Sequence, residues 1–189
     1  ASASPRRQTL LKQIGLQFET QPSHVDEPPF QGGDPASYAM ELASLKAGEI
    51  AYKVPTALIL GADTIVVVDG RVLGKPADAS EAREMLSMLS DRSHEVITAY
   101  TILCKELQIR QAHFVRTAVH FRVIDISEMD HYIASGSPFD KAGSYGIQDY
   151  SSIFVDEIQG CFYNVVGLPL SHFQSQLKKI LLSHDLRLT

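Results

Sequence analysis

The sequence predicts an α/β fold in which a mixed β-sheet is flanked by helices. Short apolar runs typical of buried strands alternate with amphipathic segments that begin at helix-capping residues. Two long strands, expected over 95–103 and 112–122, lie beside segments that return to the sheet through a helix. The 189 residues, 44% of them hydrophobic, can bury a real core, so a single domain over residues 1–189 is expected.

Two helices are predicted in the first third of the chain, each opening on a capping residue followed by proline. The first is expected over 5–14, with Gly15 as its stop, and the second over 35–52. Between them, residues 16–19 alternate like a strand and residues 25–33 have the composition of a loop.

The middle of the chain is predicted to form a strand pair around a tight turn. The apolar runs 57–60 and 65–68 are separated by Gly61-Ala62-Asp63-Thr64, which predicts a break between two strands. Asp69-Gly70 is typical of a two-residue hairpin turn, after which 71–73 returns as a strand.

The remaining elements alternate in the same way. They are a helix over 78–90, the long strands, a short helix capped near Ser127 and ended by Gly136, a glycine-rich loop over 142–146, strands at 153–155 and 165–166, and a closing helix over 169–182.

The start of the first helix is a candidate anion site. Ser4 suits the N-cap and Pro5 the first helical position, so free backbone N–H groups meet the guanidinium groups of Arg6 and Arg7. Phosphate is the best match to this arrangement. The alternative is an ordinary capped surface helix with two solvated arginines.

Charged residues that follow apolar segments are further candidates. A carboxylate at Asp63 is expensive to bury unless it binds a metal or a cation or takes a proton, although an Asx turn would also explain it. Lys75, after the hairpin, could be a solvated loop lysine, and Lys46 could be a lysine whose stem packs on the helix surface. Glu27, in an acidic pair with Asp26, could simply be solvated.

Taken together, these charges indicate phosphate chemistry. Arg6, Arg7 and the two lysines could neutralise a chain of phosphates, while Glu27 and Asp63 could hold a divalent ion of the Mg²⁺ type. Such an ion would favour attack of water on a phosphoryl centre.

Composition excludes several classes of function. The net charge of −5 argues against binding to a nucleic-acid polymer or a membrane surface, and no apolar run approaches membrane-spanning length. Cys104 and Cys161 fit no metal-ligand or redox spacing, so reduced thiols in a cytoplasmic protein are expected. The seven histidines are scattered and are not expected to bind metal.

The chain resembles the Maf family of nucleoside triphosphate pyrophosphatases over nearly its whole length. Six motifs in order carry the resemblance: Ser2-Ala3-Ser4-Pro5-Arg6-Arg7, Gly61-Ala62-Asp63-Thr64, Gly74-Lys75-Pro76, Ser93-His94-Glu95-Val96-Ile97-Thr98, Asp140-Lys141-Ala142-Gly143-Ser144-Tyr145-Gly146-Ile147-Gln148 and Val166-Gly167-Leu168-Pro169. The resemblance implies a long twisted mixed sheet with helices and two lobes around a central cleft, as in inosine-triphosphatase-like folds. It also implies that a first strand before Ala1 is truncated here.

The resemblance implies an activity and roles for individual residues. The family hydrolyses nucleoside triphosphates between the α and β phosphates, with a divalent ion, Mg²⁺ or Mn²⁺. Asp63 would accept the proton of the attacking water, and Glu27 would lie near the metal. Ser4, Arg7, Lys46 and Lys75 would surround the phosphates. A homodimer is also suggested.

Three positions resemble the subgroup that acts on dTTP, UTP and modified pyrimidine triphosphates, a house-cleaning role. They are Arg6, Thr64 and Gln148. Gln148 offers a donor and an acceptor to the N3–H and a carbonyl of uracil or thymine, although a loop glutamine bonded to backbone is the alternative. The subgroup acting on 7-methyl-GTP carries a tryptophan after Ser-Pro, and this chain has none.

Two segments depart from the family pattern, and two other functions stay open. Ser90-Asp91-Arg92 replaces Ser-Gly-Arg, and Asp149-Tyr150-Ser151-Ser152 replaces glycines beside the expected base site. The alternatives to a dTTP/UTP pyrophosphatase are a non-catalytic nucleotide-binding regulator of cell division or septum formation, and a 7-methyl-GTP pyrophosphatase.

Overall fold

The structure is a computed structural model that describes residues 4–187, so Ser2 and Ala3 of the opening motif lie outside the described part. The helices are α1 (Pro5–Gln13), α2 (Pro35–Lys53), α3 (Ala79–Leu89), α4 (Ile126–Ala134), α5 (Phe162–Val166) and α6 (Leu170–Ser183). Three short 3₁₀ turns are η1 (Ser137–Asp140), η2 (Ala142–Ser144) and η3 (Tyr150–Phe154). The strands are β1 (Ile59–Val68), β2 (Arg71–Leu73), β3 (Ser93–Cys104), β4 (Ile109–Phe121) and β5 (Val155–Gln159).

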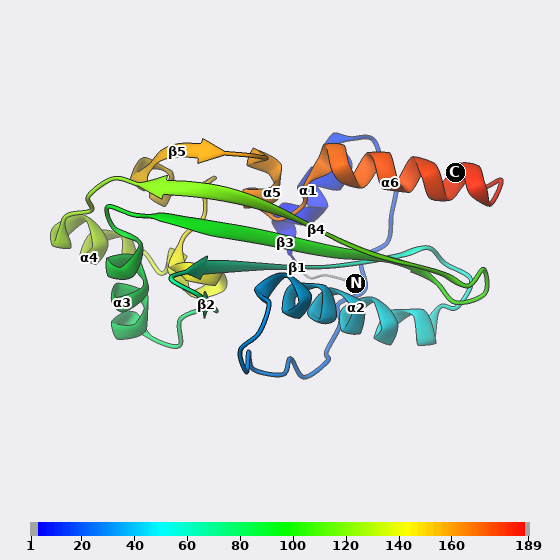
Figure 1. The fold of residues 1–189 in the computed structure, drawn as a ribbon, viewed down its shortest axis with the longest axis horizontal. Coiled ribbons are helices and arrows are strands. Elements are labelled where there is room, and N and C mark those ends of the chain that lie inside the picture. Colours follow the sequence, from blue (N-terminus) through cyan, green and yellow to red (C-terminus); the bar gives the residue numbers. More distant parts are fainter. Residues whose placement is uncertain (1–3, 188–189) are drawn as a thin grey trace. The chain divides into compact units, whose positions relative to one another are not determined.

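The strands form one open sheet in the order β2-β1-β3-β4-β5 (Figure 1). The β1–β2 and β4–β5 pairs are antiparallel, and the arrows of Figure 1 show β3 running against both β1 and β4. The predicted α/β class, a sheet flanked by helices, is therefore confirmed. The sheet is antiparallel where a mixed sheet was expected, because each long strand pairs with a neighbour that runs in the opposite direction.

The strand that carries Asp63 differs from the prediction in one important way. Strand β1 runs without interruption from Ile59 to Val68, so Asp63 lies within the strand and not at a break or in an Asx turn. The small and polar residues 61–64 look like a loop in the sequence. They fit a strand because Asp63 is neutralised by a lysine and Gly61 admits a helix backbone, as described below.

The predicted hairpin turn and the predicted starts of α1 and α2 are confirmed. Asp69 and Gly70 have φ angles of 48° and 75°, and the register Val68↔Arg71 closes a two-residue hairpin. Asp34 caps α2 by accepting hydrogen bonds from the N–H groups of residues 36 and 37, and Ser4 caps α1. No helix in the described range 4–187 has the length and apolarity needed to cross a bilayer.

Four local predictions are wrong. Residues 16–19 form no strand, and 165–166 belong to helix α5, where the buried Asn164 amide donates to Val96 O. Strand β5 begins at Val155, later than expected. Helix α4 is capped at Asp125, whose N–H donates to Glu128, and not at Ser127. The contacts of Asn164 and Asp125 are tertiary and capping contacts that the apolar pattern does not contain.

The chain divides into two compact units, in agreement with the two lobes that the resemblance implies. The first contains residues 1–63, 98–115 and 167–189, and the second contains residues 64–97 and 116–166. Among the described residues of the second unit, the core combines aliphatic side chains with the buried aromatic rings of Phe121, Tyr132, Tyr145 and Phe154. The single domain over 1–189 and the cleft stay predictions.

Candidate functional site

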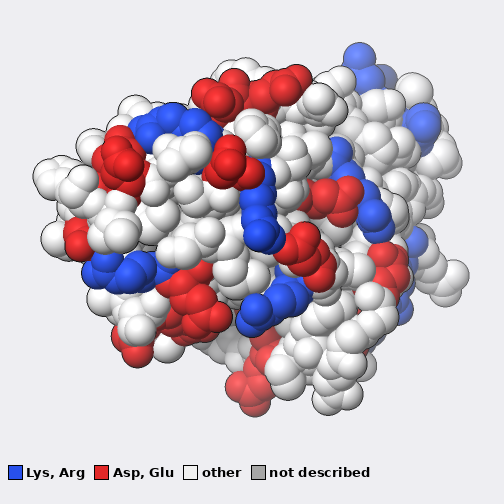
Figure 2. Space-filling model, turned by 60° about the vertical axis from the view of Figure 1, so that its left-hand side comes forward, with Lys and Arg blue, Asp and Glu red and all other residues white. Residues whose placement is uncertain are grey.

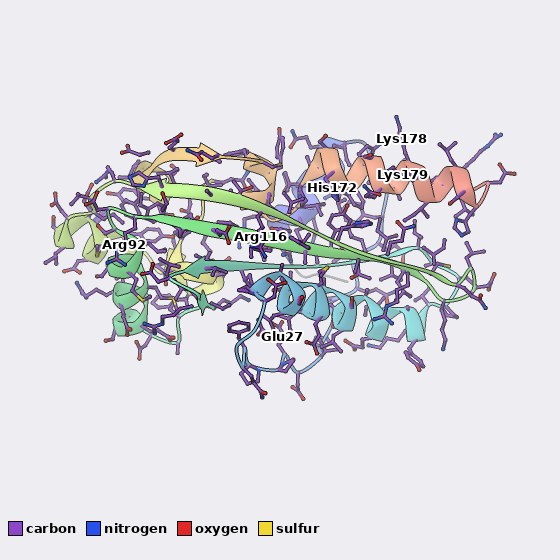
Figure 3. All side chains as sticks on the ribbon, viewed as in Figure 1. Glu27, Arg92, Arg116, His172, Lys178 and Lys179 are labelled. Carbon is purple, nitrogen blue, oxygen red and sulfur yellow. The ribbon has the colours of Figure 1, made fainter. Side chains whose placement is uncertain are left out.

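A buried carboxylate, a lysine and a second carboxylate meet in the first unit. The Nζ atom of Lys46 lies 2.6 Å from Asp63 Oδ1 and 2.7 Å from Glu27 Oε1. The side chains of Asp63 and Lys46 are 13% and 15% exposed, whereas that of Glu27 is 49% exposed. Glu27 extends from the loop that precedes α2 (Figure 3). The structure therefore brings together three of the residues singled out from the sequence.

The close packing of helix α2 on strand β1 places Lys46 beside Asp63. The buried face of α2 consists largely of alanines, among them Ala43 and Ala47. A Cβ atom on Gly61 would lie only 2.4 Å from Ala43 O and 2.7 Å from Ala47 N. The helix backbone thus contacts the strand directly, because neither partner carries a side chain that would separate them.

The environment of Asp63 changes its acidity. Burial raises the pKa of Asp63 above its ordinary value, and the positive charges of Lys46 and Arg7 act in the opposite direction. The expectation that a carboxylate buried here needs a cation is confirmed, since Lys46 supplies one. A partly desolvated carboxylate with a raised pKa is a better proton acceptor than a solvated aspartate.

Arg7 adds a second positive charge to this group. Its Nε donates to Gly167 O at 2.8 Å, and its backbone N–H donates to Ser4 Oγ at 3.4 Å. The pKa of Arg7 is lowered, chiefly by burial. The charge of Asp63 raises it, the charge of Arg6 lowers it and the charge of Glu27 raises it. An arginine stays protonated under these conditions. The predicted anion site at the start of α1 therefore lies in the electrostatic environment of Asp63, since Arg7 and Asp63 each shift the pKa of the other.

Tyr38 is a further member of the group formed by Asp63, Lys46 and Glu27, and it was not predicted from the sequence. Its hydroxyl donates to Pro28 O at 2.8 Å, and its ring lies 5.2 Å from the ring of Phe30, so it anchors the loop that carries Glu27. Burial raises the pKa of Tyr38, and the negative charges of Asp63 and Glu27 act in the same direction. Positions 38 and 46 are eight residues apart on α2, about two helical turns, a spacing that could have revealed the shared face.

Three other predicted site residues belong to the second unit. Thr64 follows Asp63 in β1 and is half-buried, whereas Lys75 and Gln148 are exposed. The residue before Lys75 is tied to the glycine-rich loop, because Gly143 N–H donates to Gly74 O at 3.0 Å. The roles of these three residues stay predictions.

The first unit contains two carboxylates that could hold a divalent metal, Glu27 and Asp63. Among residues 4–187, no group of three or more histidine, cysteine, aspartate or glutamate side chains is arranged to hold an ion. Glu27 and Asp63 share one cation, however, so the two carboxylates already converge. Two carboxylates completed by phosphate and water oxygens are the set that Mg²⁺ prefers, so these residues fit such an ion.

The charges on one face of the molecule are mixed. Figure 2 shows lysine and arginine side chains interspersed with aspartate and glutamate, with no continuous basic field on the face that is turned forward. This distribution agrees with the net charge of −5 and offers no track for a polyanionic strand on this face.

Comparison with known proteins identifies relatives over almost the whole chain. Residues 1–180 match the family model described as Maf-like protein. The dTTP/UTP pyrophosphatase of Syntrophus aciditrophicus is 46% identical over 178 residues, covering 94% of this chain and 87% of the relative. That of Syntrophomonas wolfei is 47% identical over 179 residues, covering 95% of each chain. A third, from Bacillus cytotoxicus, is 46% identical and covers 95% of this chain and 93% of the relative.

Proposed function

This chain belongs to the Maf-like protein family, and we propose that it hydrolyses nucleoside triphosphates to a nucleoside monophosphate and pyrophosphate. The proposed substrates are dTTP, UTP and modified pyrimidine triphosphates, whose removal is a house-cleaning role. The observation that carries the proposal is the contact of Lys46 with the buried Asp63 and with Glu27. Two carboxylates and a lysine at one point suit a reaction that must both bind a polyanion and activate water.

Basic side chains bind the triphosphate in this proposal. Arg7 and Lys46 supply charge in the first unit, with Arg6 and the Ser4 cap at the start of α1. Lys75 is proposed as a further phosphate ligand. When a phosphate competes for the Lys46 ammonium, that ammonium is drawn from Asp63, and the pKa of Asp63 rises further because its nearest cation has moved.

Asp63 is the proposed proton acceptor. A water oxygen attacks phosphorus, its proton passes to the Asp63 carboxylate, and the P–O bond between the α and β phosphates breaks with pyrophosphate as the leaving group. Raising the pKa of the acceptor strengthens it as a base, provided that the working pH keeps it ionised.

Glu27 and Asp63 are the proposed ligands of a divalent ion, Mg²⁺ or Mn²⁺. When bound, such an ion neutralises phosphate charge and lowers the pKa of a coordinated water. The Lys46 contact and the hydrogen bond from Tyr38 to the Glu27 loop keep the two carboxylates near each other.

Gln148, Thr64 and Arg6 are the proposed selectivity residues. The glutamine amide presents one donor and one acceptor group to the base edge, which suits the N3–H and a carbonyl of uracil or thymine.

A homodimer and a cytoplasmic location complete the proposal. Sedimentation of the purified protein tests the first of these, and fractionation of cells tests the second.

A substrate panel tests the function. Purified protein is incubated with Mg²⁺ or Mn²⁺ and UTP, dTTP, CTP, purine triphosphates or 7-methyl-GTP, and pyrophosphate is measured. We expect pyrophosphate from UTP and dTTP. Binding without any product would favour a nucleotide-sensing regulator, and product from 7-methyl-GTP alone would favour the sister activity.

The pH profile of a Lys46→Met variant tests the electrostatics. Lys46 lowers the pKa of Asp63, so its removal should move the acidic limb of the kcat/KM profile to higher pH. Turnover should also fall by about 10²-fold, as when one transition-state donor is removed. Lys53→Met is the matched control, because Lys53 lies on the same helix and pairs with Glu49 at 2.7 Å. An acidic limb that stays in place would contradict the assigned coupling.

A further inference from the structure

The segment from Tyr145 to Ser151, which carries Gln148, is fixed at its first residue by a buried hydrogen bond. The Tyr145 hydroxyl lies 2.8 Å from His94 Nε2, and the two residues are only 5% and 3% exposed. The rings also meet edge to face, 5.3 Å apart. Burial lowers the pKa of His94 to about 4, so the ring is neutral near pH 7 and the contact does not change with ordinary pH.

Ser151 fixes the other end of the segment. It is completely buried, and its Oγ accepts from the Gly146 N–H at 3.0 Å and lies 2.5 Å from Asp149 Oδ1. The same Asp149 oxygen accepts from the Ser151 N–H at 3.1 Å. The Tyr145–Gly146 peptide and the Tyr150–Ser151 peptide, which lie on either side of Gln148, are therefore joined through one hydroxyl and one carboxylate.

A buried lysine holds the second oxygen of Asp149. Lys141 is 9% exposed, and its Nζ lies 3.2 Å from Asp149 Oδ2 and 2.6 Å from Asp140 Oδ1. A Cβ atom on Gly146 would lie 2.7 Å from Lys141 Cε, so the segment packs against the lysine stem without a gap. A buried ammonium needs its counter-charges, which makes the Lys141–Asp149 contact costly to break.

The chemistry of the glutamine amide makes this rigidity relevant to base selection. Uracil offers an N3–H donor and carbonyl acceptors, whereas cytosine offers an N3 acceptor and an amino donor. A glutamine amide can match either edge by rotating its terminal group, which exchanges its oxygen and nitrogen. Peptide N–H and C=O groups held in place cannot exchange in this way, so they can discriminate where the side chain cannot.

We propose that Asp149 is a positioning residue for base selection. Held between Lys141 and Ser151, its carboxylate fixes the loop from Gly146 to Ser151, and the peptide groups that this loop presents beside Gln148 distinguish uracil or thymine from cytosine. The inference rests on the proposed function for the nature of the ligand. It goes beyond that function in assigning the choice between uracil and cytosine to the fixed backbone and to Asp149, and not to the Gln148 amide.

Binding of non-hydrolysable α,β-methylene analogues of UTP and CTP, measured by calorimetry with Mg²⁺, tests the inference without requiring turnover. Asp149→Asn removes the charge that pairs with Lys141, and the ratio of UTP to CTP analogue affinity should fall about tenfold. Gln148→Ala should weaken both analogues by similar factors and keep the ratio. Asp130→Asn, which breaks the exposed Arg83–Asp130 pair in the same unit, is the control and should keep both affinities.

The outcomes separate the two proposals. An unchanged ratio in Asp149→Asn, or equal affinity of the wild-type protein for both analogues, would overturn the role of Asp149. Selective binding of the UTP analogue without hydrolysis of UTP would contradict the proposed function alone. If Asp149→Asn melts below the assay temperature, Ser151→Ala is the alternative variant. It removes the hydroxyl that joins Asp149 to Gly146, so it should also lower the ratio of UTP to CTP analogue affinity.

Discussion

Replacing Asp63 with asparagine should reduce turnover of UTP about 10²- to 10⁴-fold, the range that a positioned general base contributes. Asparagine keeps the size of the side chain and an oxygen that can accept from Lys46, so the packing around β1 should persist. What is lost is the ability to take a proton from water and one charge at the proposed metal position. Steady-state kinetics at saturating UTP and Mg²⁺ measure the effect.

The stability of the same variant separates catalysis from folding. Burial raises the pKa of Asp63 in the folded protein, so the protonated carboxyl is favoured by folding. This stabilising contribution is fully present below the unfolded pKa of about 4 and is lost as the pH rises through the raised folded value. Above that value the wild-type protein carries a partly desolvated charge that Asp63→Asn does not.

We therefore expect the Tm of Asp63→Asn to equal or exceed that of the wild type at pH 8, although its turnover is lost. Asp69→Asn is the control, because Asp69 is an exposed turn residue of the same hairpin and asparagine accepts its positive φ angle. The control should keep wild-type turnover. Full activity of Asp63→Asn would remove Asp63 from the mechanism, and a strongly lowered Tm would assign it to the fold instead.

Local chemistry explains which parts of the fold were predictable. The start of α2 at Asp34 and the hairpin at Asp69-Gly70 depend on residues that are adjacent in sequence, and both were predicted at the right positions. The continuity of β1 through Asp63 was not. It depends on Lys46, 17 residues earlier in the chain, because this lysine offsets part of the penalty of placing a carboxylate inside a strand.

The candidate site was predictable in its residue types but not in its contacts. Charge and motif arguments grouped Glu27 with Asp63 around a metal ion and Lys46 with the phosphate-binding cations, whereas the structure joins all three through the Lys46 ammonium group. Tyr38 escaped notice because an aromatic residue on a helix is more often part of a core than the anchor of a loop. Asp149 stood out only as a departure from a family pattern, since its partner Lys141 becomes visible only in three dimensions.

Replacing Gly61 with alanine should destabilise the protein by about 1–3 kcal/mol or more, the range for overpacking in a well-packed core. The new methyl group would lie 2.4 Å from Ala43 O and 2.9 Å from Ala47 Cβ, and both partners are rigid parts of helix α2. The helix must therefore move away from β1. Urea unfolding followed by circular dichroism measures the change in the free energy of unfolding.

Gly48→Ala in the same helix is the matched control for Gly61→Ala. A Cβ atom on Gly48 meets nothing within 4 Å, so alanine should stabilise the helix by about 0.5–1 kcal/mol. Because Lys46 lies between the two alanines that contact Gly61, a shift of α2 also moves its ammonium away from Asp63. The part of the Gly61→Ala protein that is folded should then turn over UTP more slowly, with its acidic limb moved to higher pH as in Lys46→Met. Wild-type stability in Gly61→Ala would show that α2 does not owe its position to the missing side chain.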